Sequence, residues 1–173
     1  MTYPGQAPSF LPPAPPSRPS RAGGIILLLA GLLGVGAAFV SYINIEGFDQ
    51  TISLKYMFDE IGKSSAPAPG GLDNPQFWFL AAVGAGGAAV LFGLIGLAGN
   101  KGVNITAGIF GLLAAIGMAY PPIWAFTGAS LSDMAKHAGD ILKILGPGYY
   151  MLTGGAFLAL IGAVIAFIGS AKK

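Results

Sequence analysis

The chain has 173 residues, of which 54% are hydrophobic and only 9% are charged, and its mean hydropathy is +0.70. A soluble domain carries about 25% charged residues, so this composition excludes an ordinary soluble fold and indicates an integral membrane protein. The formal net charge is +2 and there is no cysteine. The absence of cysteine excludes disulfides, CxxC metal or redox motifs and thiol catalysis.

Residues 1–21 form a proline-rich segment that ends in two basic residues, Arg18 and Arg21. Such a segment cannot bury a core, and we expect a disordered cytosolic spacer. Its overlapping PxxP spacings are also typical of polyproline II peptides that dock in aromatic grooves, so a docking peptide is the alternative. The two arginines are expected to anchor the chain at the membrane edge.

Four apolar runs follow, at residues 24–42, 77–99, 103–124 and 149–170. Each approaches the roughly 20 residues that a helix needs to cross a hydrocarbon core of ~30 Å. We interpret the first run as a retained span, because the segment before it is too long and too rich in proline for a signal peptide. Residues 22–173 are therefore expected to form an all-α, integral membrane four-helix bundle with external loops at 43–76 and 125–148.

The charged residues indicate how this bundle is oriented. Five basic residues and no acidic one lie before the first span, between the second and third, and after the fourth, whereas the two other loops hold four basic and seven acidic residues. The positive-inside rule then places both termini in the cytoplasm of a multi-pass plasma-membrane protein.

The first external loop contains the sequence "TISLKYMFDEIG", which has two readings. Ile52, Leu54, Tyr56 and Phe58 alternate as in a strand, and a hairpin with residues 42–46 would result. Leu54, Met57, Phe58 and Ile61 also form a helical stripe that ends near Gly62. We favour a short helix and keep the hairpin as the alternative.

The second external loop has the pattern of an amphipathic helix from Ser130 to Leu145. Before it, Pro121 and Pro122 are expected to end or kink the third span. A polar face opposes a stripe of apolar residues, and Gly146 and Pro147 provide a stop. A helix this short needs a surface to cover its apolar stripe. The candidate partner-binding residues are therefore Leu131, Met134, Ala138, Ile141, Leu142 and Leu145.

Small residues recur every fourth position in each span, as in Ala107, Gly111, Ala115 and Ala119. Such rows let helix backbones approach closely in a membrane. We expect Gly111 and Ala115 to lie in a tight helix contact, either with another span of the same chain or with a partner helix.

The four spans contain no Asp, Glu, Lys, Arg or His. This excludes a proton relay, an ion-coupling carboxylate or a voltage sensor within them. The single histidine, His137, lies in a loop between Asp133 and Asp140, where a solvated helix face explains it better than a metal site or a general base does. We expect no cofactor, no metal and no enzymatic activity.

The opening "MTYPG", the proline-rich tail and four Ala/Gly-rich spans with one basic turn, "AGNKGVN", resemble small actinobacterial four-span membrane proteins of the 34 kDa antigenic-protein type. That resemblance implies a role in envelope maintenance and cell division. We expect a non-enzymatic accessory or scaffold subunit of a cell-envelope, division or respiratory membrane complex. Its partners would be the lipid bilayer and other membrane proteins, with no nucleic acid; a passive channel or a lipid- or solute-handling oligomer is the alternative.

Overall fold

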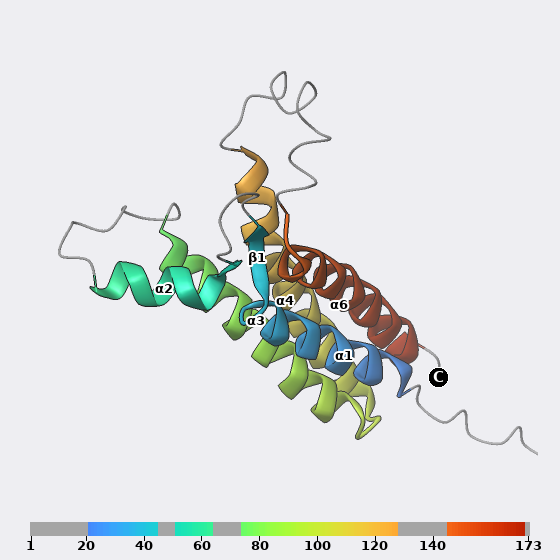
Figure 1. The fold of residues 1–173 in the computed structure, drawn as a ribbon. Coiled ribbons are helices and arrows are strands. Elements are labelled where there is room, and N and C mark those ends of the chain that lie inside the picture. Colours follow the sequence, from blue (N-terminus) through green and yellow to red (C-terminus); the bar gives the residue numbers. More distant parts are fainter. Residues whose placement is uncertain (1–20, 45–50, 64–73, 128–144, 172–173) are drawn as a thin grey trace, which may run out of the picture.

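The computed structural model describes residues 21–44, 51–63, 74–127 and 145–171. Four long helices in these ranges pack as a bundle, with a two-stranded sheet and a short helix at one end (Figure 1). The helices of the bundle are α1 (Ala22–Ala37), α3 (Pro75–Gly96), α4 (Lys101–Thr127) and α6 (Pro147–Ala171), and the other elements are β1 (Ser41–Asn44), β2 (Thr51–Ser53) and α2 (Leu54–Lys63). The predicted tail before residue 21 and the predicted amphipathic helix, apart from Leu145, lie outside the described residues.

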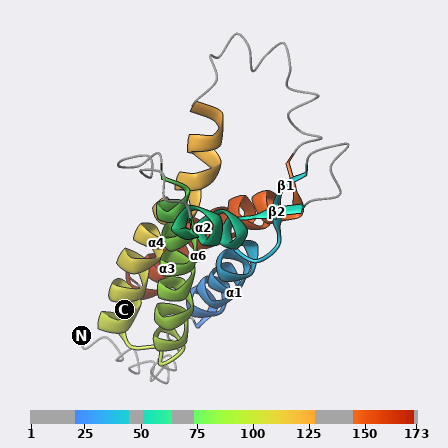
Figure 2. The ribbon, with the colours of Figure 1, turned by 60° about the vertical axis from the view of Figure 1, so that its left-hand side comes forward.

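Each helix of the bundle packs along two others. α1 packs between α3 and α6, and α4 contacts the same two helices, so that the pairs α1/α4 and α3/α6 lie on the diagonals and touch little. We call the end that carries β1, β2 and α2 the hairpin end, and the end with the short connection between α3 and α4 the turn end (Figure 2). The arrangement matches the mostly helical fold expected from the sequence.

Three helices among the described residues are long and apolar enough to cross a membrane, namely α3, α4 and α6. They correspond to the second, third and fourth predicted spans. α1 is apolar but has only 16 residues, so the predicted helical run to residue 42 is wrong in its last part. The chain leaves the helix after Ala37 because Tyr42 and its neighbours pair as a strand, which hydropathy alone does not reveal.

The side chain of Leu27 in α1 fills the middle of the turn half of the bundle and is completely buried. It lies over glycines of two other helices: a Cβ on Gly111 of α4 would come within 2.7 Å of Leu27 Cδ2, and one on Gly162 of α6 within 3.0 Å of Leu27 Cγ. Gly111 also faces Ala163 of α6, at 3.1 Å from such a Cβ. The tight helix contact expected at Gly111 is therefore present, and it joins helices of the same chain.

Met118 of α4 occupies the equivalent place nearer the hairpin end and is also completely buried. A Cβ on Gly34 of α1 would overlap the Met118 sulfur, and one on Gly155 of α6 would lie 3.4 Å from it. Met118 therefore sits in a socket made by glycines of two helices. A flexible thioether suits such an irregular space.

The backbones of α1 and α3 approach each other closely at several glycines. A Cβ on Gly31 would lie 2.5 Å from the carbonyl oxygen of Gly86, and one on Gly93 would lie 2.6 Å from the backbone nitrogen of Leu28. Close approach of this kind gives dispersion contacts along the whole interface, which replace the hydrophobic driving force that is absent between helices in lipid.

The connection between α3 and α4 is a tight turn at the sequence "LAGN". Gly99 has a φ of 74°, a left-handed conformation that favours glycine, and its N–H donates to the Gly96 carbonyl at 3.2 Å. α4 begins at once with Lys101 and brings the chain back antiparallel to α3.

Pro121 and Pro122 do not end the third span. α4 continues through both to Thr127, and Pro121 is buried. The prolines remove two N–H donors that would reach the carbonyls of Gly117 and Met118. The expectation that the prolines end the helix is therefore wrong, and the alternative that they kink it stays a prediction.

The segment predicted to be the first external loop contains both structures that its sequence suggested. β1 pairs with β2 in an antiparallel hairpin, and α2 follows β2 without a break. The strand reading holds up to Ser53, and the helical stripe holds from Leu54, where the helix starts. Ser53 Oγ accepts a hydrogen bond from the N–H of Tyr56 at 3.1 Å, and this cap marks the point at which the strand becomes a helix.

Candidate functional site at the hairpin end

The hairpin end is where chain segments from both halves of the sequence meet. β1 pairs with β2 on one side, and on its other side Ile43 forms a single antiparallel bridge with Leu145. The N–H of Gly146 donates to the carbonyl of Tyr42 at 2.9 Å. β1 is thus held from both edges, and the segment before α6 is fixed against the segment after α1.

Tyr42 is the extra residue of a β-bulge in this hairpin. The pairs Ser41 with Ser53 and Ile43 with Ile52 leave Tyr42 without an opposite residue. A bulge of this type redirects a side chain, and Tyr42 is only 1% exposed, within the buried apolar cluster. The bulge therefore places a tyrosine side chain in the interior at the end of the bundle.

The start of α6 fits closely against the end of α1. A Cβ on Gly148 would lie 2.9 Å from the carbonyl oxygens of Ala37, Val40 and Ser41, so a larger residue has no room there. Gly146 contacts Ser41 in the same way. The two glycines let the α6 terminus approach the turn between α1 and β1.

The Tyr42 hydroxyl has no hydrogen-bond partner among the residues that the structure describes. Burial raises the pKa of this hydroxyl far above its ordinary value, and the nearby Tyr149 side chain adds to the rise. The phenol is therefore neutral at physiological pH. An unpaired buried hydroxyl costs about 1–3 kcal/mol. The ring contact of Tyr42 with Tyr149 and the backbone bond to Gly146 must therefore stabilise this position enough to offset that cost.

Aromatic rings gather at the same end. Phe79 of α3 contacts Phe58 of α2, with ring centroids 4.9 Å apart, and Phe39 after α1, at 6.1 Å. Tyr42 and Tyr149 pack at 5.7 Å. Rings of this kind contribute large apolar areas and about 0.5–1.5 kcal/mol for each pair beyond burial. These contacts pack α2 and the segment after α1 against α3, and β1 against α6.

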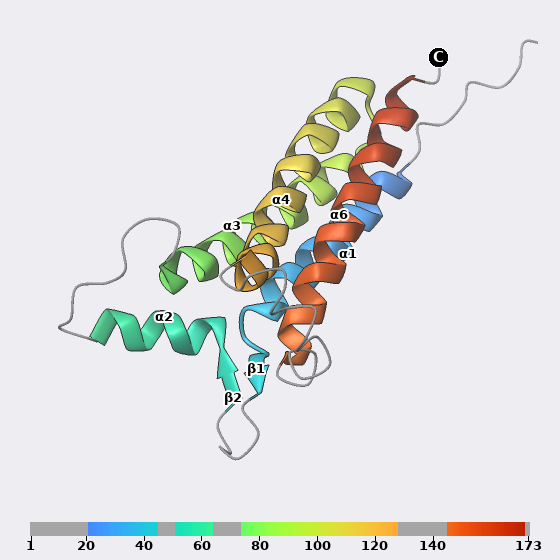
Figure 3. The ribbon, with the colours of Figure 1, turned by 90° about the horizontal axis from the view of Figure 1, so that it is seen from above.

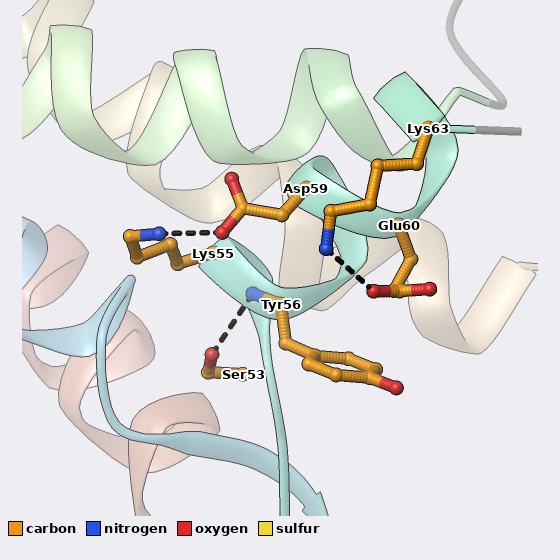
Figure 4. A network of polar contacts seen from close by, with 6 residues as sticks. All are labelled: Ser53, Lys55, Tyr56, Asp59, Glu60 and Lys63. Atoms are coloured by element: carbon orange, nitrogen blue, oxygen red, sulfur yellow. Dashed lines mark hydrogen bonds and ion pairs between the residues drawn. The ribbon is translucent and has the colours of Figure 1, made fainter.

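The polar side of α2 is shown in Figure 4. Lys55 forms an ion pair with Asp59, and Lys63 pairs with Glu60 at 3.0 Å, with all four side chains at least 40% exposed. The hydrogen bond to Glu60 raises the pKa of Lys63. Exposed pairs such as these contribute little stability, and they balance the charge of the helix.

Polar groups inside the bundle are few in the described ranges. Thr153 and Ser170 each donate to a backbone carbonyl of their own helix, as does Thr106 on the exposed side of α4. Asn104 of α4, near the turn end, is 2% exposed, and its Nδ2 has no acceptor among the described residues. These side chains either donate to backbone carbonyls or, like Asn104, lie apart from other polar groups. Those among the described residues therefore do not form a continuous polar path through the bundle.

The predicted interface residues are placed only in part. Gly111 and Ala115 lie inside the bundle, where both are buried. Leu145 lies in the bridge to Ile43, so a helix that starts at Ser130 would have to end before it. The other candidates lie outside the described residues: Leu131, Met134, Ala138, Ile141 and Leu142.

The sequence reasoning missed Tyr42 as a buried polar residue and assigned it to the end of a span. The signal that could have found it is the change from small residues to "FVSYIN", whose β-branched and aromatic residues favour a strand. It also missed the close approach of Gly31 to Gly86, since neither glycine was singled out as a contact residue.

The described residues contain no group of three or more His, Cys, Asp or Glu side chains that could hold a metal ion. Comparison with protein-family models, with curated proteins and with solved structures gives no match to this chain.

Proposed function

We propose that the chain is a four-span protein of the plasma membrane, with both termini in the cytoplasm, that serves as a non-enzymatic accessory or scaffold subunit. Its complex would act in the cell envelope, in division or in respiration. The observation that carries the proposal is a bundle interior filled by Leu27 and Met118, joined to a hairpin end that is tied by backbone bonds at both edges of β1. A rigid bundle with a fixed external platform suits the positioning of partner proteins.

We include α1 as a span, in addition to α3, α4 and α6, because of the helices that it packs against. Its 16 residues give a length of about 24 Å, short of the ~30 Å hydrocarbon core, and residues 38–42 extend the path further. Ile25, Leu29 and Leu32 are each more than half exposed and lie on one side of the helix. Because α1 packs along α3 and α6, this side would face the same lipid as theirs.

The proposed orientation rests on the charges at the two ends. Arg21 and Lys101 are exposed at the turn end, and the described part of that end carries no acidic side chain. At the hairpin end, α2 carries equal numbers of acidic and basic residues. The positive-inside rule therefore assigns the turn end to the cytoplasm.

Labelling of single cysteines tests this topology in a chain that has no native cysteine. A cysteine at the exposed position Lys63 should react with an impermeant maleimide in intact cells, and one at the exposed position Lys101 should react only after lysis. Reaction of Lys101→Cys but not of Lys63→Cys in intact cells would reverse the orientation. The same result at both positions before lysis would contradict α3 as a span, because α3 is the helix that separates them.

The scaffold role predicts a partner that is retained in stoichiometric amount when the tagged protein is purified in mild detergent. In the proposed external helix, which would begin at Ser130 and end before Leu145, Leu142→Asp should release this partner, because the carboxylate would have to be desolvated without a counter-ion. His137→Ala, on the opposite face, is the control and should retain the partner. The spans should remain inserted in both variants.

Purification as a self-oligomer alone, with solute flux after reconstitution, would contradict the scaffold role and favour the passive channel. Since Leu27 and Met118 occupy the interior of the bundle, a channel would need its lumen between copies. A cellular defect caused by His137→Ala with no effect of Leu142→Asp would instead indicate a site at His137.

A further inference from the structure

We propose that α2 is an interfacial helix, which lies flat in the headgroup region of the bilayer with its apolar side toward the boundary between headgroups and acyl chains. The inference rests on the membrane topology proposed above and goes beyond it, since it assigns a lipid-contacting role to the external element that the structure describes. Its partner is the lipid surface itself, rather than another protein.

The depth of α2 is set at both of its ends. At its beginning, the N–H of Lys55 donates to the carbonyl of Ala38, one residue after α1 ends, at 3.0 Å. At its other end, a Cβ on Gly62 would lie 3.6 Å from Nε2 of Gln76 in the first turn of α3. One contact lies just after an apolar helix ends and the other where an apolar helix begins. α2 therefore lies at the end of the bundle where the proposed spans would leave the hydrocarbon, which is the level of the headgroups.

The apolar side of α2 extends beyond the protein that it packs on. Leu54 is completely buried, whereas Met57, Phe58 and Ile61 are each half-buried. Met57 packs against the buried cluster and Phe58 against Phe79 of α3, and Ile61 lies one turn further on. Figures 1 and 3 show α2 crossing the end of α3 and reaching sideways past the bundle. Beyond the bundle, lipid would cover the part of the apolar side of α2 that the protein leaves uncovered.

The exposed apolar residues at the start of α3 also indicate that lipid lies beside α2. Phe77 and Leu80, in the first two turns of α3, are 42% and 57% exposed. In a span these side chains face lipid just below the headgroups, beside the level at which α2 lies. The apolar side of α2 is therefore continuous with the lipid-facing surface of the bundle, as in other helices that lie at a membrane interface.

The polar side of α2 determines which lipids it needs. Its two lysines are balanced by Asp59 and Glu60 in local ion pairs, so the helix has no net charge with which to attract anionic lipids. Tyr56 is 48% exposed, and tyrosine is a residue that favours the interface. Neutral lipid should therefore be sufficient to hold α2 in place.

Spin labels on single cysteines test the proposal in the full chain, reconstituted in phosphatidylcholine vesicles. Ile61→Cys reports the apolar side and Lys63→Cys the polar side, while Leu113→Cys, on the exposed face of α4, reports the middle of a span. The measurement is the ratio of relaxation by oxygen, which concentrates in lipid, to relaxation by a water-soluble nickel chelate. We expect this ratio to be several-fold higher at Ile61 than at Lys63, and highest at Leu113.

Equal ratios at Ile61 and Lys63, at the value for bulk water, would overturn the interfacial placement. Low relaxation by both reagents at Ile61 would also overturn it, because another segment of the chain would then cover this side, and spin–spin broadening there would indicate a second copy. A deeper position on adding phosphatidylglycerol would contradict the charge argument. A water-like ratio at Leu113 would refute the membrane topology itself rather than the role of α2.

Discussion

The interior of the bundle and its hairpin end are held together by opposite means. In the interior, glycines such as Gly31 and Gly86 bring backbones together, and single large side chains such as Met118 fill sockets. At the hairpin end, the contacts come from aromatic rings and from backbone bonds between distant segments, such as Gly146 with Tyr42.

The difference follows from the solvent that each region would meet. Between helices in lipid, burial of large apolar side chains has no advantage over contact with acyl chains, so stability depends on close backbone approach. At the membrane edge, burial from water again stabilises, and rings and ladder bonds become effective. We therefore expect the largest losses of stability from substitutions that change side-chain size in the interior. At the hairpin end, we expect removal of a buried hydroxyl to change how stability depends on pH.

The largest effect is expected for Gly86→Leu, compared with Gly87→Leu at the next position of α3. A Cβ on Gly86 would lie 2.7 Å from the backbone nitrogen of Val35, whereas one on Gly87 would have nothing within 4 Å. The first change forces two backbones apart and should cost about 3 kcal/mol or more. The second should be neutral, or stabilising by up to about 1 kcal/mol through helix propensity.

The yield of monodisperse protein in detergent and its thermal unfolding measure both effects. Equal tolerance of the two substitutions would mean that α1 and α3 do not pack through their backbones. Equal damage would mean that the exposed side of α3 is also an interface.

A smaller loss is expected for Met118→Ala. The side chain is completely buried among glycines that cannot fill the space it leaves, so the change should cost about 2–5 kcal/mol. Ile116→Ala, two residues away at a position 67% exposed, is the control and should have a much smaller effect. Similar losses in unfolding free energy for the two would show that Met118 is not the centre of a packed interior.

The smallest effect at neutral pH is expected for Tyr42→Phe, which removes a buried hydroxyl without a partner among the described residues. Stability should be unchanged or higher. Because burial raises the pKa of Tyr42, the folded state keeps this proton after the unfolded state has lost it. Stability of the parent protein should therefore fall as the pH rises above about 10, by up to about 1.4 kcal/mol per pH unit.

Tyr42→Phe should reduce this fall, measured by unfolding between neutral and alkaline pH. A large loss of stability of Tyr42→Phe at neutral pH would show that the hydroxyl has a partner in the folded protein. Identical alkaline profiles for Tyr42→Phe and the parent would show that this tyrosine is not buried.

The sequence alone was sufficient for the helices that depend on local pattern and length. Residues 77–99, 103–124 and 149–170 were predicted as spans and correspond to α3, α4 and α6, because about 20 apolar residues without a charge specify such a helix. The helical stripe from Leu54 to Ile61 was also read correctly. The tight contact at Gly111 could be predicted because small residues at helical spacing have few other uses in a span.

Only the tertiary structure decided where Tyr42 lies and how the segments at the hairpin end meet. Hydropathy placed Tyr42 in a helix, but its neighbours Ser41 and Ile43 pair with Ser53 and Ile52, so this part of the chain is a strand. The bridge on the other side of β1 joins Ile43 and Leu145, which are about a hundred positions apart, and no local pattern encodes it. Likewise, which glycine faces a backbone and which faces open space, as Gly86 and Gly87 do, depends on the rotation of one helix against another.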